Sequence, residues 1–148
     1  MHSTRLLAHV AAPAAMAGVR DIDRHINQCG LEPSLIELVK MRASQINGCA
    51  FCLDTHSKDA RKAGETEQRL YLLNAWDESS LFSPRERAAL AWTEALTRIE
   101  TTRAPDHVYA EVRGQFDDKQ LAELTVLVGL INLLNRVAIG LRYEPAVA

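Results

Sequence analysis

Apolar residues recur every three or four positions along most of the chain, the spacing that places them on one face of an α-helix. The clearest example is the segment 117–142, with Leu121, Leu124, Ile131 and Leu134 in that register. No stretch shows the sustained apolar–polar alternation and β-branched enrichment that are typical of strands. The pattern therefore predicts an all-α protein.

Capping and helix-breaking residues divide this pattern into about seven helices. Gly30 is a suitable residue to end the first helix, and Pro33 is favoured at the start of the second. Ser83 and Glu86 have the spacing of a capping box, with Pro84 between them, which marks the start of another helix. The expected ranges are 14–28, 33–46, 49–64, 66–76, a helix that begins at 83, 105–113 and 117–142.

The last predicted helix is apolar on every side in its middle. Such a helix must be covered all round, so we expect it to form the centre of a bundle or to pack partly against another subunit. Asn132 and Asn135 interrupt its apolar surface, and buried amides of this kind often fix how helices or subunits align. The longest apolar run, 124–135, is shorter than the roughly 20 residues that a membrane-spanning helix needs, so no membrane span is expected.

Length and composition favour one compact helical bundle over residues 1–148. The chain is 47% apolar and 24% charged, which is close to the average of folded globular proteins. Its 17 basic and 19 acidic residues give a net charge of −2, and the basic residues are scattered, so a nucleic-acid partner is not expected. The N-terminal segment lacks a signal-peptide pattern, and three cysteines do not suit a secreted disulfide framework. These features predict a cytoplasmic protein.

The segment 46–64, INGCAFCLDTHSKDARKAG, carries the candidate chemistry. If a helix begins near Cys49, then Cys52 and His56 follow it at intervals of three and four residues and share its face. Unpaired amides and the helix dipole at such a start favour a thiolate. His56 can exchange a proton with the Cys52 sulfur near neutral pH, and the two cysteines can close a local disulfide.

Glu37 is an unusual carboxylate because apolar residues surround it in the preceding helix. If it points inward, burial would favour its neutral acid unless it is paired. A partner such as His56 or a cysteine would make Glu37 a store for protons. An ordinary exposed carboxylate is the alternative.

These residues together resemble the AhpD-like alkylhydroperoxidases of the carboxymuconolactone decarboxylase superfamily. The core pattern of that family is a glutamate, then a CxxC, then a histidine four residues after the second cysteine. LIELVKMRASQINGCAFCLDTHSKDARKAGE contains it in order as Glu37, Cys49, Cys52 and His56. The similarity continues through SPRERAALAWTEALT and NLLNRVAIGL, so it covers roughly residues 20–142, with the core motif region at 33–100.

The resemblance implies an all-helical bundle that assembles into trimers or hexamers and reduces hydroperoxides. It implies that Cys52 is the peroxidatic cysteine, that Cys49 resolves the intermediate as a disulfide, and that Glu37 and His56 relay protons. It also implies no bound cofactor, and reduction by a lipoyl-bearing or thioredoxin-like dithiol protein. The best peroxidases of the family have a histidine directly before the second cysteine, where this chain has Phe51. Because a phenyl ring cannot move protons, peroxide turnover is expected to be slower. A general disulfide reductase or a redox sensor then becomes a stronger alternative.

Other interpretations of the cysteine pair stay open. Cys49 and Cys52 could be inert, or they could hold a structural metal with His56 and, more distantly, Glu37 or Cys29. A non-enzymatic helical oligomer could use the pair as a redox switch or as a metal clasp. The superfamily's lactone decarboxylases lack the cysteine pair and fit less well. Cys29 has no neighbouring cysteine and is given no role.

Overall fold

A computed structural model describes residues 3–147, and every regular element in that range is a helix. The elements are α1 (Ala8–Ala11), α2 (Pro13–Ile26), α3 (Pro33–Asn47), α4 (Ala50–Lys62), α5 (Glu67–Leu72), a 3₁₀-helix η1 (Leu73–Glu78), α6 (Pro84–Thr97), α7 (Ile99–Thr102), α8 (Asp106–Arg113) and α9 (Asp118–Leu141). The all-α prediction is confirmed, with seven helices of substantial length. The additional helices α1 and α7 are single turns that the sequence pattern did not indicate.

Side-chain caps are present at the starts of α4, α5, α6 and α9. The Ser83–Glu86 capping box is present at the start of α6, and Asp117 and Gln120 form a second one at the start of α9. The predicted helix 66–76 is instead two elements, because Ala75 has non-helical backbone angles and the chain tightens into η1 from Leu73.

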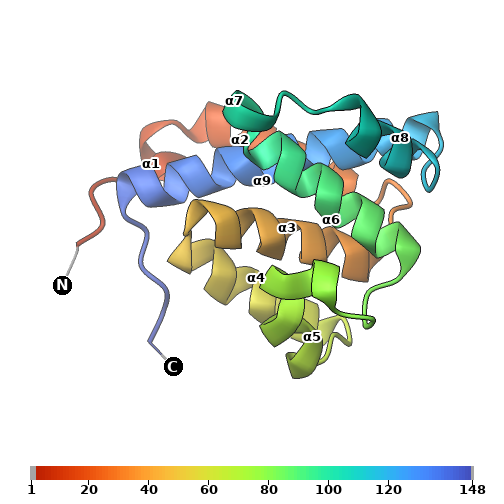
Figure 1. The fold of residues 1–148 in the computed structure, drawn as a ribbon. Coiled ribbons are helices and arrows are strands. Elements are labelled where there is room, and N and C mark those ends of the chain that lie inside the picture. Colours follow the sequence, from red (N-terminus) through yellow and green to blue (C-terminus); the bar gives the residue numbers. More distant parts are fainter. Residues whose placement is uncertain (1–2, 148) are drawn as a thin grey trace.

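Helix α9 lies at the centre of the bundle and packs against α2, α3, α4, α6 and α8 (Figure 1). Leu124, Leu127 and Ile131 are fully buried along one side of it. Val126 and Leu133 are exposed on the other side. The expectation of a central helix is therefore correct for one face, while the apolar residues of the opposite face meet solvent in the single chain.

Helix α9 extends beyond the apolar run 124–135 at both ends. The helix has 24 residues and a mean hydropathy of 1.8 in its most apolar window, so length and composition alone would allow it to cross a membrane. Core helices can have the same properties, and 39% of that window is buried inside the bundle. Its packing against five neighbouring helices is that of a core helix.

The two asparagines of α9 are partnered within the chain. Asn135 is fully buried, accepts a hydrogen bond of 2.8 Å from Asn47 and donates one of 3.0 Å to Ser44. Asn132 accepts from Asn47 at 3.0 Å and donates to Thr97 at 3.1 Å. These bonds align α9 with α3 and α6, as buried amides are expected to do.

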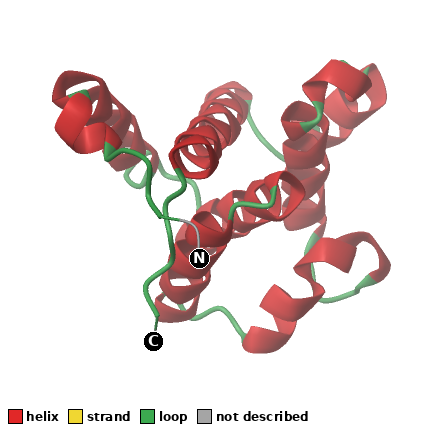
Figure 2. Cartoon of the chain, turned by 90° about the vertical axis from the view of Figure 1, so that its left-hand side faces the viewer, coloured by secondary structure: helices red, strands yellow, loops and turns green. Residues whose placement is uncertain are grey.

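The two ends of the chain run past the same end of the bundle, as the view turned by 90° shows (Figure 2). The backbone amide of Arg5 donates to the carbonyl oxygen of Leu141 at 2.9 Å. The backbone amide of Ala8 donates to the phenolic oxygen of Tyr143 at 2.8 Å. The N-terminal segment therefore fixes the chain directly after α9.

Candidate functional site

The start of α4 positions the two cysteines. Helix α3 ends at Gly48, whose left-handed backbone (φ 71°) turns the chain sharply and is accessible to glycine at little cost. Cys49 follows as the N-cap of α4, and its sulfur accepts a hydrogen bond from the backbone amide of Cys52 at 3.3 Å. A sulfur in this place receives the unpaired amides of the first turn, which favours its thiolate when the pair is reduced.

Cys49 and Cys52 are joined as a disulfide, with their Cα atoms 5.3 Å apart. Both residues are buried, at 1% and 4% exposure, and they pack against Ala138 of α9. Phe51 and Tyr143 close over this small cluster. Little of either cysteine is therefore in contact with solvent.

Glu37 and His56 lie side by side although they come from different helices. The Glu37 Oε2 atom of α3 is 2.9 Å from His56 Nδ1 of α4, and each side chain is 12% exposed. When Nδ1–H donates to the carboxylate, Nε2 keeps a free lone pair and can accept a proton. The structure thus brings together the glutamate and the histidine that the sequence pattern selected.

Cys52 and His56 both line a cavity of about 210 Å³. The remaining lining is mostly apolar and consists of Met16, Asp23, Phe51, Thr55, Leu134, Val137, Ala138 and Tyr143. A small molecule in this cavity would contact the cysteine and the histidine together. Of the four predicted residues, Cys52 and His56 line this cavity, while Cys49 and Glu37 do not.

Sequence reasoning missed an ion pair at this cavity. Lys40 is only 3% exposed and donates to Asp23 at 2.8 Å. Asp23 also lines the cavity, so the pair places a neutralised carboxylate near His56. The signal in the sequence was a lysine at position 40 between Val39 and Met41 in an apolar stretch, where a charge needs a partner.

Phe51 occupies the place of the family histidine and makes an aromatic contact. Its ring meets that of Tyr143 edge to face, with centroids 5.5 Å apart and an interplanar angle of 81°. Tyr143 lies beyond α9 and was not among the residues that the sequence pattern selected. The contact explains how an apolar ring is accommodated beside the cysteines.

One group of possible metal ligands stands out in the described residues, and it excludes the cysteines. Glu37, His56 and Asp59 offer ligand atoms within 4.8 Å of one another. Cys29 packs instead against the main core cluster, apart from the cluster that contains Cys49 and Cys52. A metal clasp built from both sulfurs and Cys29 therefore has no geometric support.

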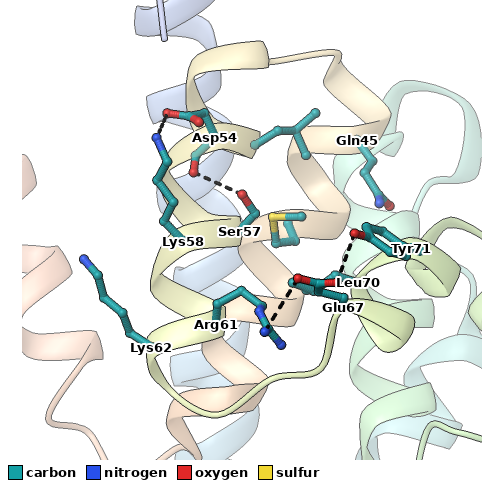
Figure 3. A pocket seen from close by; sticks show the side chains of 11 residues that line it. Gln45, Asp54, Ser57, Lys58, Arg61, Lys62, Glu67, Leu70 and Tyr71 are labelled. Carbon is teal, nitrogen blue, oxygen red and sulfur yellow. Dashed lines mark hydrogen bonds and ion pairs between the residues drawn. The ribbon is translucent and has the colours of Figure 1, made fainter. Parts of the chain in front are cut away.

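A larger cavity of about 710 Å³ lies between α3, α4 and α5 (Figure 3). Lys58, Arg61 and Lys62 of α4 stand along it, and Tyr71 closes its other edge. Lys58 is bound to Asp54, and Arg61 faces Glu67. None of the four predicted site residues lines this cavity.

Comparisons with known proteins agree with this architecture. The model of the carboxymuconolactone decarboxylase family matches residues 4–95. The uncharacterized protein YdfG of Bacillus subtilis is 42% identical over 144 residues, which is 97% of this chain and 98% of that protein. A crystal structure of an Agrobacterium tumefaciens protein of unknown function, provisionally assigned as the antioxidant defence protein AhpD, superimposes with a TM-score of 0.95 at 40% identity. That match covers 99% of this chain and 100% of the other.

A more distant match shows the same fold in a debrominase. The debrominase Bmp8 has a TM-score of 0.82 at 17% identity, and the match covers 90% of this chain and 72% of that one. At this identity the likeness concerns the fold alone.

Proposed function

The chain belongs to the carboxymuconolactone decarboxylase family and has its AhpD-like fold, and from that premise we propose that it is a thiol-dependent peroxidase of the cytoplasm. The observation that carries the proposal is the cavity shared by Cys52 and His56, with His56 held by Glu37. A redox-active cysteine beside an oriented base is the arrangement that hydroperoxide reduction requires.

The proposed reaction begins with the reduced pair. The Cys52 thiolate attacks the terminal oxygen of a hydroperoxide, the O–O bond breaks, and the alkoxide leaves as an alcohol after it takes a proton. The Cys49 thiol then attacks the Cys52 sulfenic acid, and water leaves as the disulfide forms. One hydroperoxide and two thiols thus become one alcohol, one water and one disulfide.

Glu37 and His56 are assigned the proton transfers of this sequence. His56 Nε2 is the atom left free by the hydrogen bond at Nδ1, so it can take the Cys52 proton and return it to the leaving oxygen. The Glu37 carboxylate fixes the orientation of the ring and stabilises its protonated form. Neither step needs a bound cofactor.

The electron donor in this proposal is a dithiol protein, lipoyl-bearing or thioredoxin-like. The same proposal includes a homo-oligomer, a trimer or hexamer. The exposed apolar residues Val126 and Leu133, which lie seven positions apart on one face of α9, support an assembly because that face is uncovered in the single chain.

The test is peroxide consumption by the purified protein with dithiothreitol as donor. We expect Cys52→Ser to abolish turnover, and Cys49→Ser to stop at a Cys52 sulfenic acid that dimedone labels. Cys29→Ser is the matched control, because Cys29 packs in a different cluster, and it should keep full turnover. Equal activity of the wild type and Cys52→Ser would refute the assignment.

Phe51 supports a second candidate, a general disulfide reductase. The phenyl ring stands where the best peroxidases of the family have a further proton carrier, and it lines the Cys52 cavity. In this case insulin disulfides would be reduced in the presence of dithiothreitol faster than hydroperoxides. A comparison of the two rates with the same preparation decides between the candidates.

A further inference from the structure

The two disulfide-bonded cysteines line different cavities. Cys52 lines the cavity of about 210 Å³ that also contains His56. Cys49 lines a second cavity, of about 320 Å³, which is bordered by Gly48, Ala50, Ile139 and the residues after α9, Arg142, Glu144 and Pro145. Neither cavity is lined by both cysteines.

The two cavities share a wall made of Phe51, Ala138 and Tyr143. Phe51 and Tyr143 are in edge-to-face contact. The backbone amide of Tyr143 donates to the Ala138 carbonyl oxygen at 2.9 Å, and its phenolic oxygen accepts from the Ala8 amide. These two bonds fix Tyr143 in its place in the wall between the cavities.

We infer that the oxidant and the reductant reach the cysteine pair from different sides: hydroperoxide enters the Cys52 cavity, and the dithiol donor attacks Cys49 from the second cavity. The inference rests on the proposed function and extends it to the reductive half of the cycle. A thiolate attacks a disulfide sulfur in line with the S–S bond and expels the other sulfur. Attack on Cys49 therefore expels Cys52 toward the cavity that contains His56.

The chemistry of each step balances with these assignments. A donor thiolate forms a bond to the Cys49 sulfur, the Cys49–Cys52 bond breaks, and the electron pair goes to the Cys52 sulfur, which takes a proton from His56. The second donor thiol then attacks the donor sulfur bound to Cys49, closes the donor's own disulfide and releases Cys49. The donor loses two electrons and two protons, and the cysteine pair gains them.

The hydrogen bond at the start of α4 favours the second step, in which Cys49 is released from the mixed disulfide with the donor. The Cys49 sulfur accepts the Cys52 amide at 3.3 Å, and this contact stabilises Cys49 as a departing thiolate. The first departing sulfur, Cys52, shares its cavity with His56 instead. Each cysteine thus has its own means of leaving, an acid for Cys52 and a backbone amide for Cys49.

The linings of the two cavities also differ in polarity, and this difference matters for the approach of a donor thiolate. The Cys49 cavity has Arg142 and Glu144 at its border, so an approaching thiolate meets a cation there as well as a carboxylate. The Cys52 cavity is mostly apolar, and Asp23, the acidic residue in its lining, is paired with Lys40. An apolar lining favours a neutral hydroperoxide over a charged thiolate.

The first experiment identifies the sulfur that is attacked. The protein is oxidised with diamide, mixed briefly with 2-mercaptoethanol, quenched with acid, blocked with N-ethylmaleimide and analysed by peptide mass spectrometry. We expect the mercaptoethanol adduct on Cys49 and the maleimide on Cys52. Adducts that are mainly on Cys52, or equal on both cysteines, would overturn the inference.

The second experiment narrows one cavity at a time. Ala50 lines only the Cys49 cavity, and Val137 lines only the Cys52 cavity. We expect Ala50→Phe to slow reduction by dithiothreitol about tenfold and to leave oxidation by cumene hydroperoxide within about twofold, whereas Val137→Phe does the opposite. Ile139→Phe is a second obstruction of the Cys49 cavity at an exposed position, in case Ala50→Phe disturbs the helix start.

The outcomes separate this inference from the proposed peroxidase activity. Reduction is measured on protein oxidised with diamide, so it does not depend on any reaction with hydroperoxide. If hydroperoxide fails to oxidise the wild-type pair, the peroxidase proposal is wrong, and the adduct position still decides where the reductant attacks. If Ala50→Phe and Ile139→Phe reduce at the wild-type rate, or if both slow oxidation equally, the separate entrances are wrong.

Discussion

Glu37 and His56, 19 residues apart in the chain, meet through a 2.9 Å contact between Oε2 and Nδ1 that joins α3 to α4. The contact matters because α4 also carries Cys52, so the carboxylate on one helix sets the position of the imidazole beside the sulfur on the other. Any loss of the Glu37 charge should therefore affect proton transfer more than it affects the fold.

The first prediction concerns this carboxylate. We expect Glu37→Gln to lower kcat/KM for hydroperoxide about 100-fold, because the amide holds the ring but cannot stabilise its protonated form. Glu123→Gln is the matched control, since Glu123 also lies 2.9 Å from a histidine, His25, at an exposed site outside the cavity. Steady-state kinetics with both variants provide the measurement, and an equal loss in the two would contradict the role of Glu37.

The second prediction concerns Phe51. A histidine at this position adds a proton carrier to the Cys52 cavity, so we expect Phe51→His to raise peroxide turnover about tenfold. The change also removes the contact with Tyr143 and should lower the free energy of unfolding by about 1 kcal/mol. Phe51→Leu is the control, because it loses the same contact without adding a proton carrier. If both variants gain activity, the gain comes from a loosened cavity and the interpretation is wrong.

The third prediction concerns the amide network that aligns α9. We expect Asn135→Ala to lower the free energy of unfolding by about 2 kcal/mol, because it removes one of the two acceptors of Asn47 and takes the amide donor away from the buried Ser44 hydroxyl. Urea denaturation provides the measurement. Asn74→Ala, at an exposed position, should change stability by less than about 0.5 kcal/mol. A similar loss in both variants would show that Asn135 has no special part in holding the helices.

The fourth prediction concerns pH and the pair Glu32–Arg85, which links the start of α3 to α6. The hydrogen bond from Arg85 lowers the pKa of Glu32 below its usual value of 4.5. Because this pKa is lower in the folded state than in the unfolded state, the ionised carboxylate stabilises the fold at pH values above the unfolded-state pKa. That stabilisation is lost as the pH falls through the folded-state pKa. Glu32→Gln should therefore be less stable than the wild type at pH 7, and the difference should be smaller at pH 3.

The magnitude of this pH effect is small. The Glu32 side chain is 48% exposed, so solvent screens the pair and the difference at pH 7 should be a few tenths of a kcal/mol, about 0.5 at most. Urea denaturation of both proteins at the two pH values measures it. A difference that grows as the pH falls would contradict the assignment.

The sequence was sufficient to predict the features that depend on neighbouring residues. Helix starts such as the Ser83–Glu86 box are determined within four residues, and the spacing of Cys49, Cys52 and His56 places them on one helix. The pairing of Glu37 with His56 was reached as one option for a buried carboxylate. The catalytic roles of these residues stay predictions until the variants are measured.

Features that depend on distant packing were not accessible in the same way. The wall residue Tyr143 takes its place because the Ala8 amide, 135 residues away, bonds to it. The Lys40–Asp23 pair needs the docking of α2 on the rest of the bundle, and nothing in the spacing of the two residues indicates it. The break at Ala75 likewise reflects the packing of η1 on α3, where helical spacing alone predicted a continuous helix.

The position of both sulfurs within the first turn of α4 has a consequence for the speed of the cycle. Opening and closing a bond between residues three apart requires the rearrangement of that turn only, while the remainder of α4 with His56 keeps its packing on α3 and α9. Motions of this size are completed far faster than the movement of domains. If the pair cycles as proposed, we therefore expect the change between its two oxidation states to be confined to this turn, with the surface of the bundle left in place.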